Sequence, residues 1–268
     1  MSLSFSPRLA TADDYPRFAR LFPELGVPDP VPSPEAFATR WLPRVVILQD
    51  EAGDAVGYSA WNVFGETFHV GNVVTAPEAR RRGGGRALLE DLRRRARDAG
   101  CRRWYLNVKQ ANAVAIRLYE RCGLAIEQEG WTLSATWASL ATLPRAAREI
   151  ETYAPSTDDD ARIAPRFGLD VERIARARER GAVLRALGGA VPLGFAAFDP
   201  SFPGVYPIRA ARPELARALF DALRPFAKHE HVRVFVEADR ALADALRGAG
   251  ATLDFALYRM SGPLDLLR

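Results

Sequence analysis

The sequence has few of the residues that build disulfide frameworks and metal sites. It contains two cysteines, Cys101 and Cys122, and three histidines, with neither a CxxC nor an HExxH motif. Two cysteines cannot form a disulfide framework, so we expect reduced thiols and a cytoplasmic location. The scarcity of clustered ligands predicts that the chain binds no metal.

Long apolar runs are also missing. The longest unbroken aliphatic runs are short stretches such as Val45 to Leu48, far shorter than the ~20 residues that span a bilayer. The first residues lack a basic segment followed by an apolar run, so neither a secretory signal nor a membrane partner is expected. With 268 residues, 48% hydrophobic and 26% charged, the chain suits one large domain or two of ordinary size.

Positive charge is concentrated in one segment. The formal net charge is +4, and the only lysines are Lys109 and Lys228. Residues 80–103 hold ten arginines against three acidic residues, a net charge of +7, so the rest of the chain carries about −3. A nucleic-acid-binding surface would spread its positive charge more widely. We therefore expect no nucleic-acid partner, and an anionic ligand near this segment.

The apolar pattern predicts an alternation of helices and strands. One helix is expected to begin near residues 12–14, and three others are expected to cover residues 34–41, 86–99 and 113–122. The expected strands cover residues 45–48, 55–64, 68–75, 104–108 and 124–135. Residues 138–160 contain two prolines and an acidic run, which indicates a linker with some helix in it.

After this stretch the pattern recurs. Arg86–Leu92 matches Arg217–Leu223 at an offset of 131, and Gly123–Ser134 matches Gly250–Ser261 at an offset of 127. Such an internal repeat predicts two copies of one fold in tandem. The expected domains are a first copy over residues 1–137, a linker over 138–160 and a second copy over 161–268.

A glycine cluster stands between a strand and a helix in the first copy. Its sequence is Arg80-Arg81-Arg82-Gly83-Gly84-Gly85, followed by Arg86 and the amphipathic helix. Backbone N–H groups at a helix N-terminus, with no side chains in the way, form an anion site. The pattern is neither GxGxxG nor GxxxxGK[ST]. A flexible turn with a solvated arginine face is the alternative.

A second motif follows one helix and one strand later. Asn112 opens a helix that ends in Leu118-Tyr119-Glu120-Arg121-Cys122-Gly123-Leu124, with Leu124 where a Phe is usual. Together the two segments resemble the GNAT family, the GCN5-related N-acetyltransferases. The resemblance covers roughly residues 8–133 and implies an α/β fold of the α+β type. In each of the two GNAT-like domains a mixed, largely antiparallel central sheet would be flanked by helices.

The resemblance also implies that acetyl-CoA is the acyl donor. Its pyrophosphate would rest on the N–H groups of the glycine turn, and its pantetheine arm would pair with the strand before that turn. The cofactor-binding residues implied in this way are Val73, Val74, Thr75, Arg80, Arg81, Arg82, Gly83, Gly84, Gly85, Arg86, Asn112 and Tyr119. Asn112 is also a typical helix N-cap and could serve in both capacities.

Acetyl transfer to an amine needs an acid, an oxyanion donor and a base. Tyr119 matches the family's usual acid, which protonates the departing thiolate, although a buried aromatic is the structural alternative. The N–H of Val74 is the candidate donor to the tetrahedral oxyanion.

The base is less clearly marked. Strand alternation puts His69, Gly71, Val73 and Thr75 on one face, and His69 falls where histone-acetylating members carry a catalytic Glu. Glu66 or a water chain are the alternatives. The ribosomal-protein alanine acetyltransferases use a Glu where this chain has Asn107, which argues against that substrate.

The second copy lacks the expected site residues. At the offsets of the repeat, Pro213 and Glu214 replace Arg82 and Gly83, Asp239 replaces Asn112 and Leu246 replaces Tyr119. We expect it to shape the acceptor cleft and bind no cofactor. The chain is predicted to be an N-acetyltransferase acting on a small-molecule or protein amine, and a non-catalytic acyl-CoA-binding protein is the alternative. A monomer with an internal pseudo-dimer and a homodimer both remain open.

Overall fold

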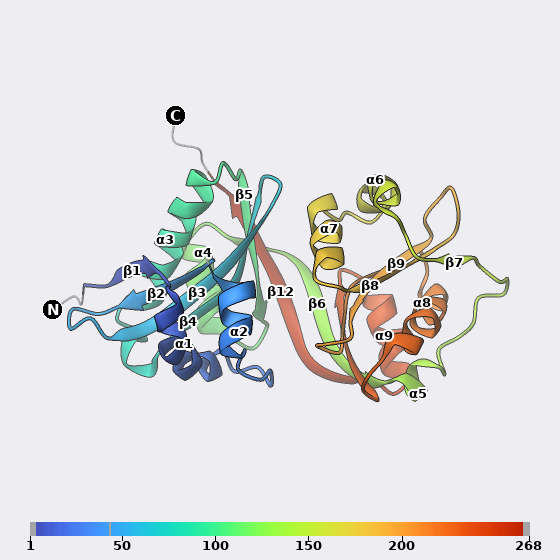
Figure 1. Cartoon of the computed structure of the whole chain (residues 1–268), viewed down its shortest axis with the longest axis horizontal. Helices are drawn as coiled ribbons and strands as arrows, with labels where there is room; N and C mark the ends of the chain where they lie inside the picture. Colours follow the sequence, from blue (N-terminus) through green and yellow to red (C-terminus); the bar gives the residue numbers. More distant parts are fainter. Residues whose placement is uncertain (1–3, 43, 265–268) are drawn as a thin grey trace. The chain divides into compact units, whose positions relative to one another are not determined.

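The computed structural model describes residues 4–42 and 44–264, and the chain divides into two compact units (Figure 1). The first unit comprises Met1–Val108, Asn112–Glu127 and Arg259–Arg268, and the second comprises Lys109–Ala111 and Gln128–Tyr258. Strands β6 (Ala125–Thr136) and β12 (Thr252–Pro263) thus contribute to both units. This division differs from the predicted one because the last strand ends in the first unit.

The first unit contains strands β1 to β5 in addition to its parts of β6 and β12, with helices on both faces. Its elements are β1 (Ser6–Leu9), α1 (Tyr15–Leu21), α2 (Pro34–Ala36), β2 (Val45–Gln49), β3 (Ala55–Phe64), β4 (Thr67–Thr75), α3 (Gly84–Asp98), β5 (Arg103–Lys109) and α4 (Ala113–Arg121). The strands lie in the order β1-β2-β3-β4-β5, and every neighbouring pair is antiparallel except β4–β5, which is parallel.

The second unit repeats this arrangement. Its elements are α5 (Trp137–Leu140), β7 (Thr152–Tyr153), α6 (Thr157–Arg166), α7 (Val171–Glu179), β8 (Val183–Leu187), β9 (Gly194–Asp199), β10 (Gly204–Ala210), α8 (Ala216–Leu223), β11 (His231–Glu237) and α9 (Arg240–Gly248). The strand order is β6-β11-β10-β9-β8-β7, again with one parallel pair, β10–β11. The predicted fold class, a mixed α/β fold with a largely antiparallel sheet flanked by helices, is confirmed.

Alternation along the strands decides which helix each face of the first sheet contacts. In β2, Val45 packs in the same cluster as Phe18 of α1, whereas Val46 packs in the cluster that contains Leu88 of α3. A strand buried on both faces needs a continuous apolar run, and Val45 to Leu48 supplies one.

The end of β12 is built into the first unit. The N–H of Leu264 donates to the carbonyl of Arg102 at 2.8 Å, and Met260 is fully buried. A Cβ on Gly262 would lie 2.2 Å from the carbonyl oxygen of Gly123, so only glycine allows this approach. The first unit is therefore completed by residues from the far end of the chain.

The stretch expected to be a linker contains ordered elements. Helix α5 lies at its start, and the acidic run forms the first turn of α6. Asp160 is buried and pairs with Arg178 of α7 at 2.7 Å. Acidic residues stabilise a helix N-terminus, which explains why this run begins a helix.

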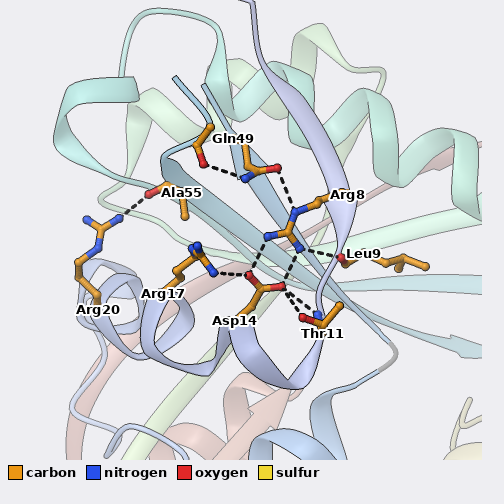
Figure 2. Close-up of polar contacts among 9 residues, drawn as sticks. Arg8, Leu9, Thr11, Asp14, Arg17, Arg20, Gln49 and Ala55 are labelled. Atoms are coloured by element: carbon orange, nitrogen blue, oxygen red, sulfur yellow. Dashed lines mark hydrogen bonds and ion pairs between the residues drawn. The ribbon is translucent and has the colours of Figure 1, made fainter. Parts of the chain in front are cut away.

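A buried carboxylate ties the first strand to the first helix (Figure 2). Arg8 donates to both oxygens of Asp14, at 2.6 and 2.7 Å, and Arg17 and the backbone N–H of Thr11 donate to it at 3.1 and 2.9 Å. Asp14 is 1% exposed. The hydrogen bond from Arg8 is the main cause that holds the pKa of Asp14 well below its usual range.

Over residues 4–42 and 44–264, no helix is long and apolar enough to cross a membrane. In the same ranges, no group of three or more His, Cys, Asp or Glu side chains is placed to hold a metal ion. Both cysteines are free thiols, Cys101 buried and Cys122 half-buried.

Candidate active site

A cavity of about 1200 Å³ opens in the first unit between α3, α4 and the end of β4. Eleven of the predicted site residues line it: Val73, Val74, Thr75, Arg80, Arg81, Gly83, Gly84, Gly85, Arg86, Asn112 and Tyr119. Arg82 and His69 are the two predicted residues outside this lining. The two motifs, separate in the sequence, thus meet around one space.

The glycine turn lines this cavity at the N-terminus of α3. Arg81 and Gly83 have positive φ angles of 59° and 100°, and Gly83 is the N-cap of α3, without a side-chain cap. The first N–H groups of a helix have no acceptor within the helix. With the positive end of the helix dipole, they form a site suited to phosphate.

Gly84 and Gly85 allow close packing around the turn. A Cβ on Gly84 would lie 3.2 Å from the carbonyl oxygen of Ala79, and a Cβ on Gly85 would lie 3.0 Å from Cδ2 of Leu118 in α4. The contact of Gly85 with Leu118 places the start of α3 against the middle of α4. Three consecutive glycines therefore serve different steric needs.

Strands β4 and β5 separate at the cavity. Their parallel pairing runs from Thr67 with Arg103 to Val70 with Leu106, although both strands continue, to Thr75 and Lys109. The stretch from Val73 to Thr75 therefore has one edge turned toward the opening and lines the cavity. An extended ligand can pair with this edge.

A β-bulge in β4 changes which residues share a face. Ala60 and Trp61 are consecutive in β3, but their partners in β4 are Asn72 and Val70. Gly71, which lies between these partners, is therefore an extra residue without a partner in β3. Val73 packs on the α3 side, in the same cluster as Trp61, and Trp61 stacks on Phe68 at 6.0 Å. The expectation that His69 shares a face with Val73 and Thr75 is wrong, because the bulge reverses the alternation.

The register also redirects the N–H of Val74. The N–H of Ala76 donates to the carbonyl of Val56 at 2.8 Å, and Val74 stands opposite Tyr58. Hydrogen-bonded pairs alternate along an antiparallel ladder, so Val74 turns its N–H toward β3. The N–H groups of Val73 and Thr75 point the other way, into the opening. Val74 is thus wrong as the oxyanion donor.

Tyr119 lies in the wall of the cavity and is 8% exposed. Burial, with a smaller contribution from Cys122, raises its pKa to about 12, so the phenol stays protonated at neutral pH. Asn112 caps α4, because its Oδ1 accepts from the N–H of Ala115 at 3.1 Å. The N-cap role expected for Asn112 is thus confirmed, and its role toward a ligand stays a prediction.

His69 stacks on Tyr105, its neighbour in β5, with ring centroids 4.6 Å apart. The guanidinium of Arg259, from β12, lies 3.9 Å from the centroid of the Tyr105 ring. Glu66 lies in the β3–β4 turn, mostly exposed, and pairs with Arg102 at 3.2 Å. Since His69 occupies the face of β4 opposite to Val73, any role as a base would be exerted from that face.

Sequence reasoning missed several residues at the site. Trp104, Val114, Arg117 and Arg121 all line the cavity. The spacing of the last three on α4 was readable, but only the packing of α4 against α3 shows which helix face is turned inward. Asn107, at the point where β5 leaves β4, has a buried Oδ1 without a hydrogen-bond partner, a feature that no pattern predicts.

Comparison with known proteins identifies the first unit. A family model described as the acetyltransferase (GNAT) family matches residues 14–124. The first unit contains a GNAT acetyltransferase domain. The chain is also 36% identical over 119 residues to a protein named mycothiol acetyltransferase from Saccharomonospora viridis. The match covers 42% of this chain and 37% of the relative, so the chain aligns with well under half of that protein.

Solved structures extend the likeness in fold to both units. A GCN5-related N-acetyltransferase from Sphaerobacter thermophilus has a TM-score of 0.66 at 18% identity, covering 97% of this chain and 96% of that one. A tandem GNAT protein from the clavulanic acid biosynthesis pathway has a TM-score of 0.63 at 17% identity, covering 99% and 100%. The chain has a tandem GNAT fold.

Proposed function

We propose that the chain is an N-acetyltransferase that moves the acetyl group of acetyl-CoA directly to a primary amine of a small molecule or a protein. The observation that carries the proposal is that the glycine turn, the free edge of β4, Asn112 and Tyr119 all line the same cavity. The turn suits the pyrophosphate, the edge suits the pantetheine amides, and Tyr119 is a protonated group beside the path between them.

Each residue then has a defined part in the transfer. The acceptor nitrogen attacks the thioester carbonyl, a C–N bond forms and the C–S bond breaks. The turn lies after the end of β4, so the arm runs back along the strand and brings the carbonyl oxygen to the N–H of Val73. Tyr119 gives its proton to the departing thiolate. His69 takes the proton of the amine, directly or through water.

The test is release of free CoA thiol when acetyl-CoA is offered with a panel of primary amines. The panel combines polyamines, amino sugars, peptide N-termini and lysine peptides, and includes mycothiol precursors because a relative is named mycothiol acetyltransferase. Thiol release above the amine-free rate with at least one amine, and mass-spectrometric detection of the acetylated amine, support the proposal. Tight acetyl-CoA binding without any transfer would instead favour a non-catalytic acyl-CoA-binding protein.

A further inference from the structure

Asn107 has a polar side chain on the face of the first sheet that carries His69, and the chemistry proposed above does not use it. Tyr105 is the parallel partner of His69, and Asn107, two positions further along β5, points to the same face, beyond the stretch paired with β4. Its side-chain amide makes no hydrogen bond within residues 4–42 and 44–264, and its Oδ1 is buried. A buried amide oxygen without a donor is costly, which favours a ligand that supplies one.

Arg259 of β12 stands opposite Asn107. Two backbone hydrogen bonds set the register of β5 and β12: from Gln110 N–H to the Ala256 carbonyl at 2.9 Å, and from Leu264 N–H to the Arg102 carbonyl at 2.8 Å. Both fit the same antiparallel register, which pairs position 107 with position 259. Residues directly opposite each other in such a ladder share a face of the sheet, so the two side chains are neighbours.

The guanidinium of Arg259 is held by one of its flat faces and by one edge. It lies over the ring of Tyr105, and its Nε is 3.4 Å from a carboxylate oxygen of Glu127. In the part of the chain that the structure describes, its two terminal nitrogens donate no hydrogen bond, and the side chain is 22% exposed. A stacked guanidinium keeps the N–H groups in its plane for a carboxylate.

The charged groups around Arg259 leave this face of the sheet positive. Glu127 also accepts from Arg103, so one carboxylate serves two guanidinium groups. Glu66 is already paired at the β3–β4 turn. Lys109, the next residue of β5 on this face, is a further cation. A ligand with a negative group would therefore be attracted here.

We infer that the acceptor is a small primary amine that carries a carboxylate, as an amino acid does, with Arg259 binding the carboxylate and Asn107 accepting a hydrogen bond from the amine. This inference rests on the proposed function, because it names the acceptor class of the same reaction. The amide of Asn107 can turn about its last side-chain bond to present Oδ1. His69, beside Tyr105 on the same face, then takes the proton of the amine. The first unit receives its anion-binding group from the far end of the chain.

The experiment measures kcat/KM for thiol release from acetyl-CoA by the full-length protein with matched pairs of amines. Glycine, alanine, leucine, glutamate, β-alanine and γ-aminobutyrate are each compared with the corresponding primary amide at the main-chain carboxylate. At least one acid is expected to react about tenfold or more efficiently than its amide. The amide form has the less basic amine and therefore more free base at neutral pH, so amine reactivity alone would give the opposite preference.

Arg259→Gln should abolish this preference by raising KM for the acid, and the rates with the amides should change little. Arg259→Lys should keep part of the preference, because it retains the charge. Asn107→Ala should raise KM for both members of a pair and leave the preference as it is. The affinity for acetyl-CoA, measured by calorimetry, should be unaltered in all three variants, because these residues lie outside the lining of the donor cavity.

Arg240→Gln is the matched control. Arg240, in the second unit, also lies over an aromatic ring, that of Trp131 at 5.2 Å, and also pairs with a glutamate, Glu129 at 2.6 Å. It should leave the preference unchanged.

Three outcomes would overturn the inference and leave the proposed function standing. The first is thiol release with amines or amides but without a preference for any acid. The second is a preference that survives Arg259→Gln undiminished. The third is an equal loss with acids and amides in Arg259→Gln, which would show that Arg259 has a structural role only. If no amine of any kind releases thiol, the proposed function fails and the inference fails with it.

Discussion

His69 and Val73 lie on opposite faces of β4, although they stand an even number of positions, four, apart along the strand. The extra residue is Gly71, which has no side chain and is exposed, so the bulge forms at a point where little packing is lost. The bulge has a chemical consequence. A ligand that pairs with Val73 and Thr75 and an acceptor that approaches His69 would meet the strand from different sides.

His69→Ala should remove the acidic limb of the rate profile. An imidazole acts as a base only in its deprotonated form, so the unaltered enzyme should slow at acidic pH if His69 accepts the proton of the amine. The variant should have a lower and flatter profile of kcat/KM between pH 5 and 8. Glu66→Gln is the control for the alternative base. If the glutamine variant loses the limb and the alanine variant keeps it, the assignments are reversed.

Tyr119→Phe should lower turnover and leave acetyl-CoA binding nearly intact. The hydroxyl contributes only as the thiolate departs, and a general acid is worth about 10²–10⁴ in rate. With a pKa of about 12, the phenol stays protonated through neutral and mildly basic pH, so its titration should not limit the rate there. Single-turnover kinetics with calorimetry would test this. A variant that turns over normally, or one that no longer binds the donor, contradicts the role.

Gly83→Glu should weaken acetyl-CoA binding by at least about 2 kcal/mol, because a carboxylate would stand among the phosphates. Gly53→Glu is a matched control, since Gly53 also has a positive φ but lies in the β2–β3 turn, away from the cavity; a Cβ would meet nothing within 4 Å at Gly53 and only Phe5, at 3.9 Å, at Gly83. Both variants carry similar backbone strain, so their difference isolates the charge. Calorimetry that finds equal affinities in the two variants would show that the phosphates bind elsewhere.

The local parts of the site could be predicted from the sequence, and the parts that depend on pairing could not. The glycine turn and the Asn112 cap are signalled within a few residues, because helix ends need particular side chains and angles. The reversal at Gly71 depends on a partner strand, so simple alternation misplaced His69. The N–H of Val74 was misassigned for the same reason, since ladder register decides where a backbone group points.

The exact division into units could not be predicted from the sequence for the same reason, because it depends on which strands pair. The repeat correctly indicated two copies of one fold, because a shared pattern of apolar residues survives when other positions change. It could not indicate that residues from Arg259 onward complete the first unit. That exchange depends on a fit between Gly262 and Gly123, distant in the sequence, and the local pattern of a strand is the same whichever sheet it joins.

Asp14→Asn should destabilise the protein by about 1.5–3 kcal/mol, because a buried acceptor of charged hydrogen bonds loses its charge (Figure 2). The pKa of this carboxyl is lowered on folding, so its contribution is complete above the unfolded pKa of ~3.9 and declines as the pH falls below it. The difference between the unaltered protein and the variant in denaturant unfolding should therefore shrink below about pH 4. Asp13→Asn, at the exposed neighbour, is the control. A constant difference down to pH 2 would contradict the ion-pair explanation.

In the second unit, two parallel neighbouring strands also separate, and side chains of the unit itself connect them where they part. Strands β10 and β11 pair only at Gly204 with Arg233 and Val205 with Val234, and both then continue. Beyond that point, Arg209 of β10 donates to Glu237 of β11 at 2.8 Å.

Tyr206 of β10 donates to the same carboxylate at 3.0 Å and also contacts Arg173 of α7. Glu237 is 3% exposed, and an ion pair removed from water is costly to break. At the offset of the repeat, Glu214, Leu215 and Ala216 stand where the first unit has its three glycines, and Pro213 before them has no N–H to offer a phosphate.

The chain should therefore bind one acetyl-CoA, at the first unit. Titration of the full-length protein should give a stoichiometry near one, and Tyr119→Phe should keep it, because that variant changes the chemistry and not the phosphate site. Glu237→Gln should leave the stoichiometry at one, since loosening the bridge supplies neither glycines nor phosphate donors. In Gly83→Glu the single transition should weaken as a whole. Two equivalent sites per chain, or a site of unaltered affinity that survives in Gly83→Glu, would mean that the second unit binds the donor and that its bridge opens to admit it.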